Sequence, residues 1–181
     1  MEVQILSAAP QAVYLARVLR AILAGIVPGR HASGAIYGTL VTAGTILAAS
    51  EGAQDVVEVG ITVVVTLALY WIAHSYAEVL GNADAVAPSW RVAARELAVE
   101  SPMVAACIIP LIVLLAADLL LGASFELAVT IGLCTTVGLL FVWGILAARR
   151  AELSRGWAVI SGLVYTFLGV AIVVLKLVLL H

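Results

Sequence analysis

The stretch VVEVGITVVVTLALYWIAHSYAEV, residues Val56–Val79, is the most informative part of this sequence. A helix needs about 17–25 mostly apolar residues to cross the hydrocarbon core of a bilayer, and this stretch meets that length. Its acids and its histidine are Glu58, His74 and Glu78, and the two glutamates lie near its ends. The stretch is therefore predicted to be a transmembrane helix.

Four further stretches have the same character, so the predicted spans are residues 33–50, 56–79, 103–121, 127–148 and 157–180. The composition agrees, because 64% of the 181 residues are hydrophobic and 11% are charged, with a mean hydropathy of +1.18. Soluble domains are nearer half apolar and a quarter charged. The sequence predicts an all-α fold, a polytopic membrane helix bundle with about five transmembrane helices in one domain, residues 33–181.

Two segments outside the spans are predicted to be amphipathic helices at the membrane surface. Residues 1–32 form the first, because Arg17 and Arg20 interrupt an apolar run, and each arginine inside a span would cost about 2.5–3.5 kcal/mol. Trp90–Glu100 forms the second and joins spans two and three. Ser101-Pro102 then begins the third span, with proline in the first turn, where its missing N–H does no harm.

The basic residues give the predicted orientation. Eight of the nine precede span one, lie between spans two and three, or lie between spans four and five: Arg17, Arg20, Arg30, Arg91, Arg95, Arg149, Arg150 and Arg155. The other two loops contain no lysine or arginine. Since basic loops stay on the inner side of a membrane, the N-terminus is predicted to be cytoplasmic and the C-terminus to be outside.

Span two carries a stripe of polar residues at steps of four: Glu58, Thr62, Thr66, Tyr70, His74 and Glu78. Each step advances about 40° around a helix, so the stripe winds slowly along the whole span. One interpretation is a polar transport path with His74 as its titratable group. The other is structural: hydroxyl groups bond to helix carbonyls, and the two glutamates lie at the membrane interfaces.

Asp118 and Lys176 lie near the outer ends of spans three and five and are candidates for a structural ion pair. Lys176 could instead extend to the outer surface by itself. Asp118 is also a candidate for the transport path, as an outer acid together with Glu58. The outer side is acidic, which would attract cations, but the confinement of basic residues to the inner side leaves acids there in any case.

Small residues predict close helix packing. Gly34 and Gly38 form a GxxxG pattern in span one, and Gly162 and Gly169 lie on one face of span five. Pro110 predicts a kink in span three, because it has no N–H to donate to the preceding turn.

No catalytic residue, cofactor or metal site is expected. Neither HExxH, G-x-S-x-G nor a glycine-rich phosphate loop occurs, so an enzyme is not predicted. Cys107 and Cys134 each lie inside an apolar run and are interpreted as small apolar residues. The net charge of −2 gives no reason to expect a nucleic acid partner.

Several stretches together resemble a group of small actinobacterial integral membrane proteins. They are Ile36–Thr39, Tyr70–Ala77 with its YWxAHxYA motif, Ser101–Met103 and Leu175–His181. The resemblance implies a five-span architecture in a bacterial plasma membrane. It implies no activity.

The function expected from these observations is membrane transport: a channel or transporter for protons or small cations. One copy encloses little volume, so a pore is expected between copies of a homo-oligomer, with the lipid bilayer as its surroundings. The alternative is a non-conducting assembly, anchoring or regulatory protein that packs against another membrane protein.

Overall fold

The computed structural model describes residues 32–81 and 90–179, and within them the chain is helical without a strand. The helices are α2 (Ala32–Ala49), α3 (Val56–Gly81), α4 (Trp90–Val99), α5 (Ser101–Ala105), α6 (Ile108–Leu121), α7 (Phe125–Arg150) and α8 (Arg155–Leu179). The predicted N-terminal surface helix lies outside the described residues, apart from Ala32.

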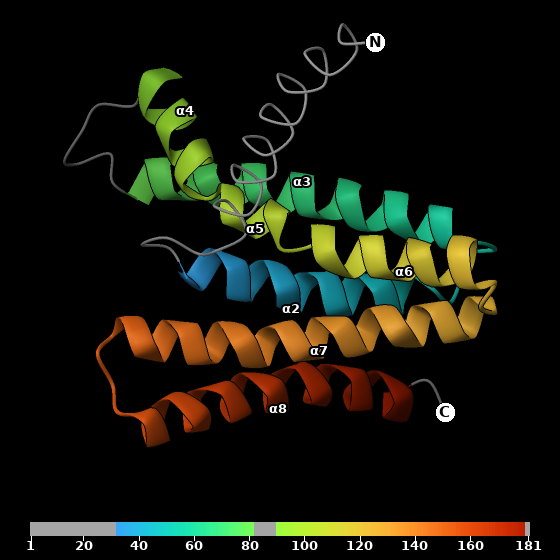
Figure 1. The fold of residues 1–181 in the computed structure, drawn as a ribbon. Coiled ribbons are helices and arrows are strands. Elements are labelled where there is room, and N and C mark those ends of the chain that lie inside the picture. The colour runs from blue at the N-terminus through green and yellow to red at the C-terminus, as the bar shows by residue number, and fades with distance from the viewer. Residues whose placement is uncertain (1–31, 82–89, 180–181) are drawn as a thin grey trace, which may run out of the picture.

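Four helical segments are long and apolar enough to cross a membrane: Val56–Gly81, Trp90–Leu121, Phe125–Arg150 and Arg155–Val174. The first predicted span corresponds to a shorter apolar helix, Ser33–Ala49. The predicted all-helical fold is thereby confirmed for the described residues, with four helices that are long and apolar enough to cross a membrane. Helices α2, α3, α6, α7 and α8 run in alternating directions along one axis (Figure 1).

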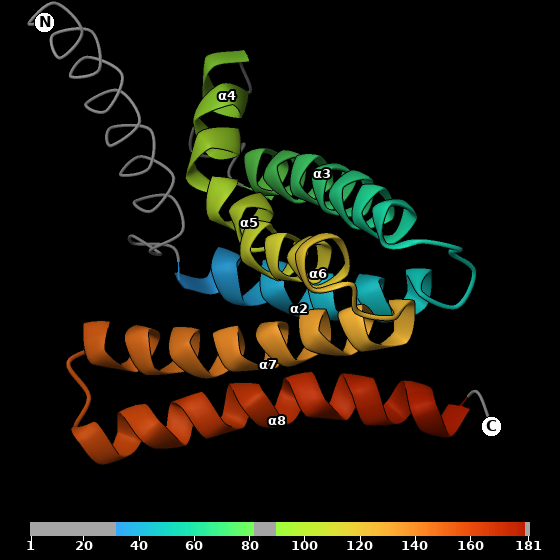
Figure 2. The same ribbon diagram turned by 45° about the vertical axis from the view of Figure 1, so that its right-hand side comes forward.

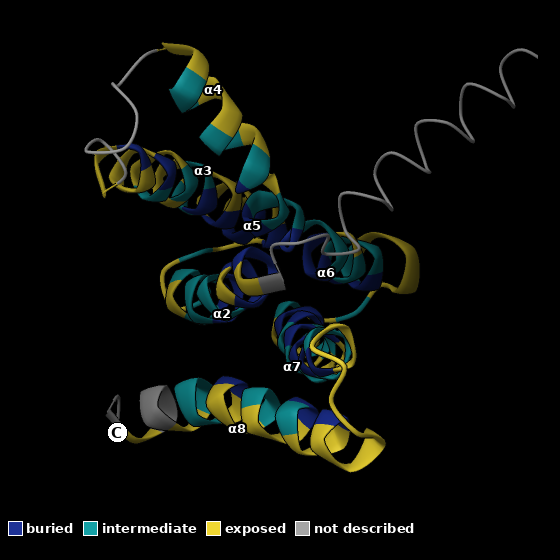
Figure 3. Ribbon diagram, turned by 90° about the vertical axis from the view of Figure 1, so that its left-hand side faces the viewer, coloured by how far each residue is buried: buried dark blue, intermediate teal, exposed yellow. Residues whose placement is uncertain are grey.

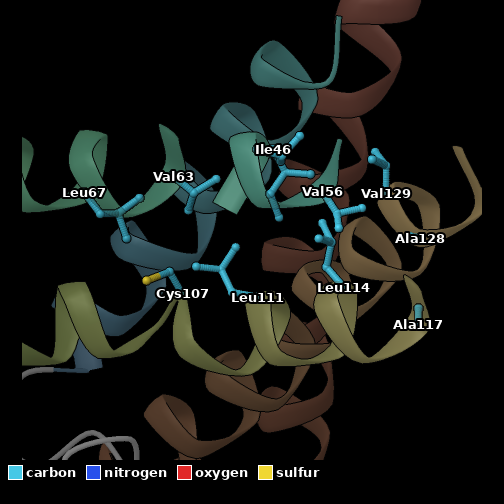
Figure 4. Close-up of a cluster of buried hydrophobic side chains, with 11 residues drawn as sticks. Ile46, Val56, Val63, Leu67, Cys107, Leu111, Leu114, Ala117, Ala128 and Val129 are labelled. Atoms are coloured by element: carbon cyan, nitrogen blue, oxygen red, sulfur yellow. The ribbon is translucent and has the colours of Figure 1, made fainter. Parts of the chain in front are cut away.

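Helix α7 lies between α8 on one side and α2 and α6 on the other, with α3 outside α2 and α6 (Figures 1 and 2). The main core lies between α2, α3, α6 and α7 (Figure 4). Its members are small or aliphatic, such as Ile46, Val63, Leu67 and Leu114, each without measurable exposure. Such residues let neighbouring helices pack closely inside a membrane, where packing replaces the hydrophobic effect as the source of helix association.

Polar side chains and one glycine cap the start of α3, the end of α6 and the start of α7, which lie at the same end of the bundle. At the start of α3, Asp55 Oδ1 accepts from the Glu58 N–H at 2.8 Å, and Glu58 Oε2 accepts from the Gln54 N–H at 3.0 Å. This exchange resembles a capping box. Helix α6 ends at Gly122 with φ 61°, a left-handed conformation that glycine adopts without strain. Ser124 then caps α7.

Two prolines divide the segment from Trp90 to Leu121 into three helices. Pro102 has no N–H for the Ala98 carbonyl, and the Ser101 hydroxyl donates to that carbonyl instead, at 2.8 Å. Pro110 likewise has no N–H for the Ala106 carbonyl, and the chain is interrupted at residues 106–107 between α5 and α6. The predicted kink in the third span lies at this interruption.

Helix α4 turns away from the axis of the long helices at one end of the bundle and extends outward beside α3 (Figures 2 and 3). Figure 2 shows α4 running across the direction of α7 and α8, and Figure 3, which views α2 and α7 nearly end on, shows α4 from its side. None of its residues is buried. The helix predicted over Trp90–Glu100 is present as α4, and its position at a membrane surface stays a prediction.

Candidate functional site

The site is built on a close contact between α2 and α5. A Cβ atom added to Gly38 would overlap the backbone of Met103, and one added to Gly34 would lie 3.2 Å from Glu100 Oε2. Only glycine lets the two backbones come this near. The predicted GxxxG pattern thus places the start of α5, with Glu100 just before it, against the first turns of α2.

Glu100 is a charged residue that the fold nearly covers, with a relative exposure of 9%. Its carboxylate lies beside Gly34, two residues after the first residue of α2. The first N–H groups of a helix have no partner within the helix and carry partial positive charge. The Glu100 carboxylate therefore lies next to the positively polarised first turn of α2.

The imidazole nearest this carboxylate is that of His74 on α3. Its Nε2 lies 3.8 Å from Glu100 Oε2, and the two side chains are 33% and 12% exposed. This contact is an ion pair when the imidazole is protonated. The His74 ring also lies parallel to that of Tyr70, one turn earlier, with ring centroids 6.2 Å apart and an interplanar angle of 9°. A base and a phenol from α3 thus meet an acid from the residue before α5 at one end of the bundle.

An indole hydrogen bond joins α3 to α4 beside this contact. Trp71 Nε1 donates to the Leu97 carbonyl at 3.0 Å. Leu97 lies in the last turn of α4, where carbonyl groups need partners from outside the helix. Trp71, three residues before His74 on α3, therefore anchors the end of α4.

Replacing Trp71 with phenylalanine removes this donor and keeps an aromatic ring. We expect amide hydrogen exchange in Trp90–Val99 to accelerate about two- to tenfold, since a net hydrogen bond contributes about 0.5–1.5 kcal/mol. Trp157→Phe is the control, because Trp157 is 60% exposed on α8. Unchanged exchange in α4 of the Trp71 variant would show that the indole does not hold this helix.

A small cavity of about 100 Å³ lies between α3 and α4, lined by Ile72, Ser75, Tyr76, Ala93 and Leu97. The Ser75 hydroxyl is buried and has no hydrogen-bond partner among the described residues. The cavity exceeds the volume that one water molecule requires, and water is the usual partner of a buried hydroxyl. The α3–α4 junction is thus less tightly packed than the core.

The polar stripe of α3 faces away from the bundle. Glu58, Thr62, Tyr70 and Glu78 are exposed, whereas Thr66 and His74 are partly buried. The buried face of α3 consists instead of Val56, Val59, Gly60, Val63, Leu67, Ser75 and Val79. Among the described residues, the stripe therefore lines no path between helices, and its exposed members are left uncovered.

The other candidates lie elsewhere. Asp118 is partly buried near the end of α6, at the end of the bundle opposite His74 (Figure 1). The side chain of Lys176 is outside the described part of the structure, so its pairing with Asp118 stays a prediction. Helices α6 and α8 lie on different sides of α7 in Figures 1 and 2.

The glycines of α8 pack against α7. A Cβ on Gly162 would lie 2.8 Å from the ring of Phe141, and one on Gly169 would meet Leu140. Gly144 of α7 adds to this contact, because its Cβ would come within 2.7 Å of the Gly162 backbone. These positions are thus filled within a single copy of the chain.

A wider groove of about 610 Å³ lies between α2, α7 and α8 at the end far from His74. Its lining is mostly aliphatic and includes Leu47, Glu126 and the exposed Cys134. Among the residues described, no three His, Cys, Asp or Glu side chains gather as metal ligands.

Glu100 is the functional candidate that the sequence interpretation missed, since it entered only as the last residue of a surface helix. A signal was available: an acid immediately before Ser101-Pro102 and an apolar span lies at the same predicted membrane face as the histidine end of span two. Three of the stretches that carry the family resemblance, around Gly38, His74 and Ser101, meet at this site. Comparison with protein-family models, with curated proteins and with solved structures gives no match for the chain.

Proposed function

We propose that this chain is a five-span protein of a bacterial plasma membrane that forms homo-oligomers and moves protons or small cations. Its N-terminus would be cytoplasmic, with α2 as the first and shortest span. The path would run between copies, along the polar stripe of α3. The observation that carries this proposal is the outward position of the stripe.

Physical arguments support a path between copies. The four fully or nearly buried hydroxyl side chains of the described residues are Thr39, Thr42, Ser75 and Thr136, and the three threonines donate to carbonyls of their own helices. The interior of one copy thus offers no continuous polar route through the described part. Polar groups on the outside of a span favour contact with protein or water over lipid. A ring of copies would cover the stripes of all its members.

The ends of the stripe fit this proposal. Glu58 lies at the outer mouth of such a path, as does Asp118 on the neighbouring α6. At the other end, His74 can hold or release a proton beside the Glu100 carboxylate, 3.8 Å away. Histidine is suited to proton transfer because its charge changes near neutral pH. The described arginines lie at this end too, on α4 and at the turn between α7 and α8.

A non-conducting protein that packs against a membrane partner is the second candidate. The observation in its favour is that the polar groups of the stripe partly satisfy one another within α3. Thr62 donates to the Glu58 carbonyl at 2.9 Å, and the Glu58 carboxylate caps the helix start. Thr62 and Glu58, bonded in this way, need no water at these groups. Co-purification of a second membrane protein in constant ratio would support this candidate.

A liposome flux assay tests transport directly. Purified protein is reconstituted with a pH-sensitive or a cation-sensitive dye, and an ion gradient is applied. We expect flux above that of empty vesicles, and we expect His74→Ala to reduce it to the level of empty vesicles. Absence of flux in the unchanged protein under every gradient would exclude the transport proposal.

A matched pair of threonines tests the position of the path. Thr62 and Thr130 are both exposed, and each donates to the carbonyl four residues earlier, at 2.9 and 2.8 Å. Only Thr62 belongs to the stripe. We expect Thr62→Ile to lower flux and Thr130→Ile to leave it unchanged, and equal effects would contradict a path along α3.

A further inference from the structure

The exposed outer face of helix α4 is basic and aromatic, and the acid of this helix lies on its other face. The exposed residues are Trp90, Arg91, Ala94, Arg95 and Ala98, and none of them is acidic. The one acid of the helix, Glu96, lies on the partly buried face with Val92, Ala93, Leu97 and Val99. Arg91 and Arg95 thus lie on a different face of α4 from Glu96, although Arg95 and Glu96 are adjacent in the sequence.

Trp90 and Arg91 form the most prominent part of this face. Trp90 is 76% exposed, and the Arg91 guanidinium carbon lies 5.4 Å from the centre of its ring. An indole beside arginines is typical of residues at the level of lipid headgroups, where the ring enters the interface and guanidinium groups bind phosphates. Arg95, one turn after Arg91, adds a second positive charge to the same face.

The orientation of the helix fits a membrane surface. Helix α4 runs across the direction of α7 and α8, so its axis would lie along the bilayer plane if the long helices cross the bilayer (Figures 2 and 3). Trp71 holds its inner side to α3 through the Leu97 carbonyl. The outer face is left free by the described residues and is directed away from α3.

We propose that the outer face of α4 is a docking surface for anionic phospholipids of the membrane in which the chain lies. Trp90 enters the interface, and Arg91 and Arg95 bind lipid phosphates. A basic residue near an anionic surface gains about 1 kcal/mol, which corresponds to about fivefold in the ratio of docked to undocked helix. The proposal does not depend on whether the chain conducts ions.

The test uses the full chain with Ala94→Cys, in a background of Cys107→Ala and Cys134→Ala. The new cysteine carries a polarity-sensitive fluorophore, and the protein is placed in nanodiscs of phosphatidylcholine with or without phosphatidylglycerol. We expect phosphatidylglycerol to shift the emission to the blue and to increase quenching by nitroxide lipids. Added salt should reverse both effects.

Two double variants that each lose two positive charges test whether the response to phosphatidylglycerol depends on the arginines of α4. Arg91→Gln with Arg95→Gln should lower the docked-to-undocked ratio about 25-fold, as two steps of about fivefold. Arg149→Gln with Arg155→Gln removes two arginines from the turn between α7 and α8 and should leave the emission unchanged. Emission that ignores phosphatidylglycerol, or equal losses in both variants, would overturn the proposal. Circular dichroism confirms that each variant is folded.

Discussion

Replacing Gly38 with alanine is expected to destabilise the folded bundle by about 3 kcal/mol, the upper part of the range for overpacking a tight contact. The added Cβ would overlap the Met103 backbone, with 2.8 Å to its carbonyl carbon and 2.9 Å to its Cα. Two backbones meet here, so no flexible side chain can move aside. Relief requires α2 and α5 to separate. The midpoint of unfolding in detergent, followed by circular dichroism, measures the loss.

Gly138 provides the matched control for this substitution. It lies inside α7, and a Cβ added there meets nothing within 4 Å. Alanine at this position should therefore be neutral or should stabilise the helix by up to about 1 kcal/mol, because glycine is the more flexible residue. Equal midpoints for the two variants would show that the contact between α2 and α5 does not limit stability.

The same substitution has a consequence at the site. Glu100 precedes α5, so a separation of α2 from α5 also withdraws its carboxylate from the first turn of α2. Gly38→Ala should therefore lower flux even where enough folded protein remains for reconstitution. A variant with lost stability and unchanged flux would separate the packing role of this glycine from the site.

The membrane architecture could be predicted from sequence because the signals are local and physically strong. Runs such as Val56–Val79 and residues 127–148 can be satisfied only as helices in lipid. The glycines were also informative, since spacing alone placed Gly34 and Gly38 on one packing face. The first span is the exception: α2 is the shortest of the predicted spans, and its crossing of the membrane stays a prediction.

The direction of the α3 stripe could not be predicted, because a polar face says that a helix avoids lipid but not which partner it contacts. The structure places valines and Leu67 toward the core and leaves Glu58, Thr62 and Tyr70 outside. The sequence signal at Glu100 did not reveal its contact with His74, because this contact depends on the break at Ser101-Pro102 and on the glycines of α2. Contacts of this kind arise from tertiary packing and leave no periodic pattern.

The contact between Glu100 and His74 gives the last prediction. Glu100→Gln keeps the size of the side chain and removes its charge. It should cost about 1–2 kcal/mol of stability, because the carboxylate loses both its interaction with the first turn of α2 and its interaction with the imidazole. His74→Gln should cost less than about 1 kcal/mol, because a third of this side chain is exposed and solvent screens the pair. Glu152→Gln, at an exposed acid near the same end, is the control.

The double variant distinguishes a direct interaction from two independent effects. Once residue 100 is neutral, His74 has no ion pair left to lose, so the double variant should be about as stable as Glu100→Gln alone. Such non-additivity is the mark of residues that interact. If the two losses of stability simply add, His74 and Glu100 do not interact energetically, although their side chains lie 3.8 Å apart. The Glu100 carboxylate then stabilises the fold only through α2. Flux measured on the same four proteins then shows whether proton transfer needs the coupled pair or only the histidine.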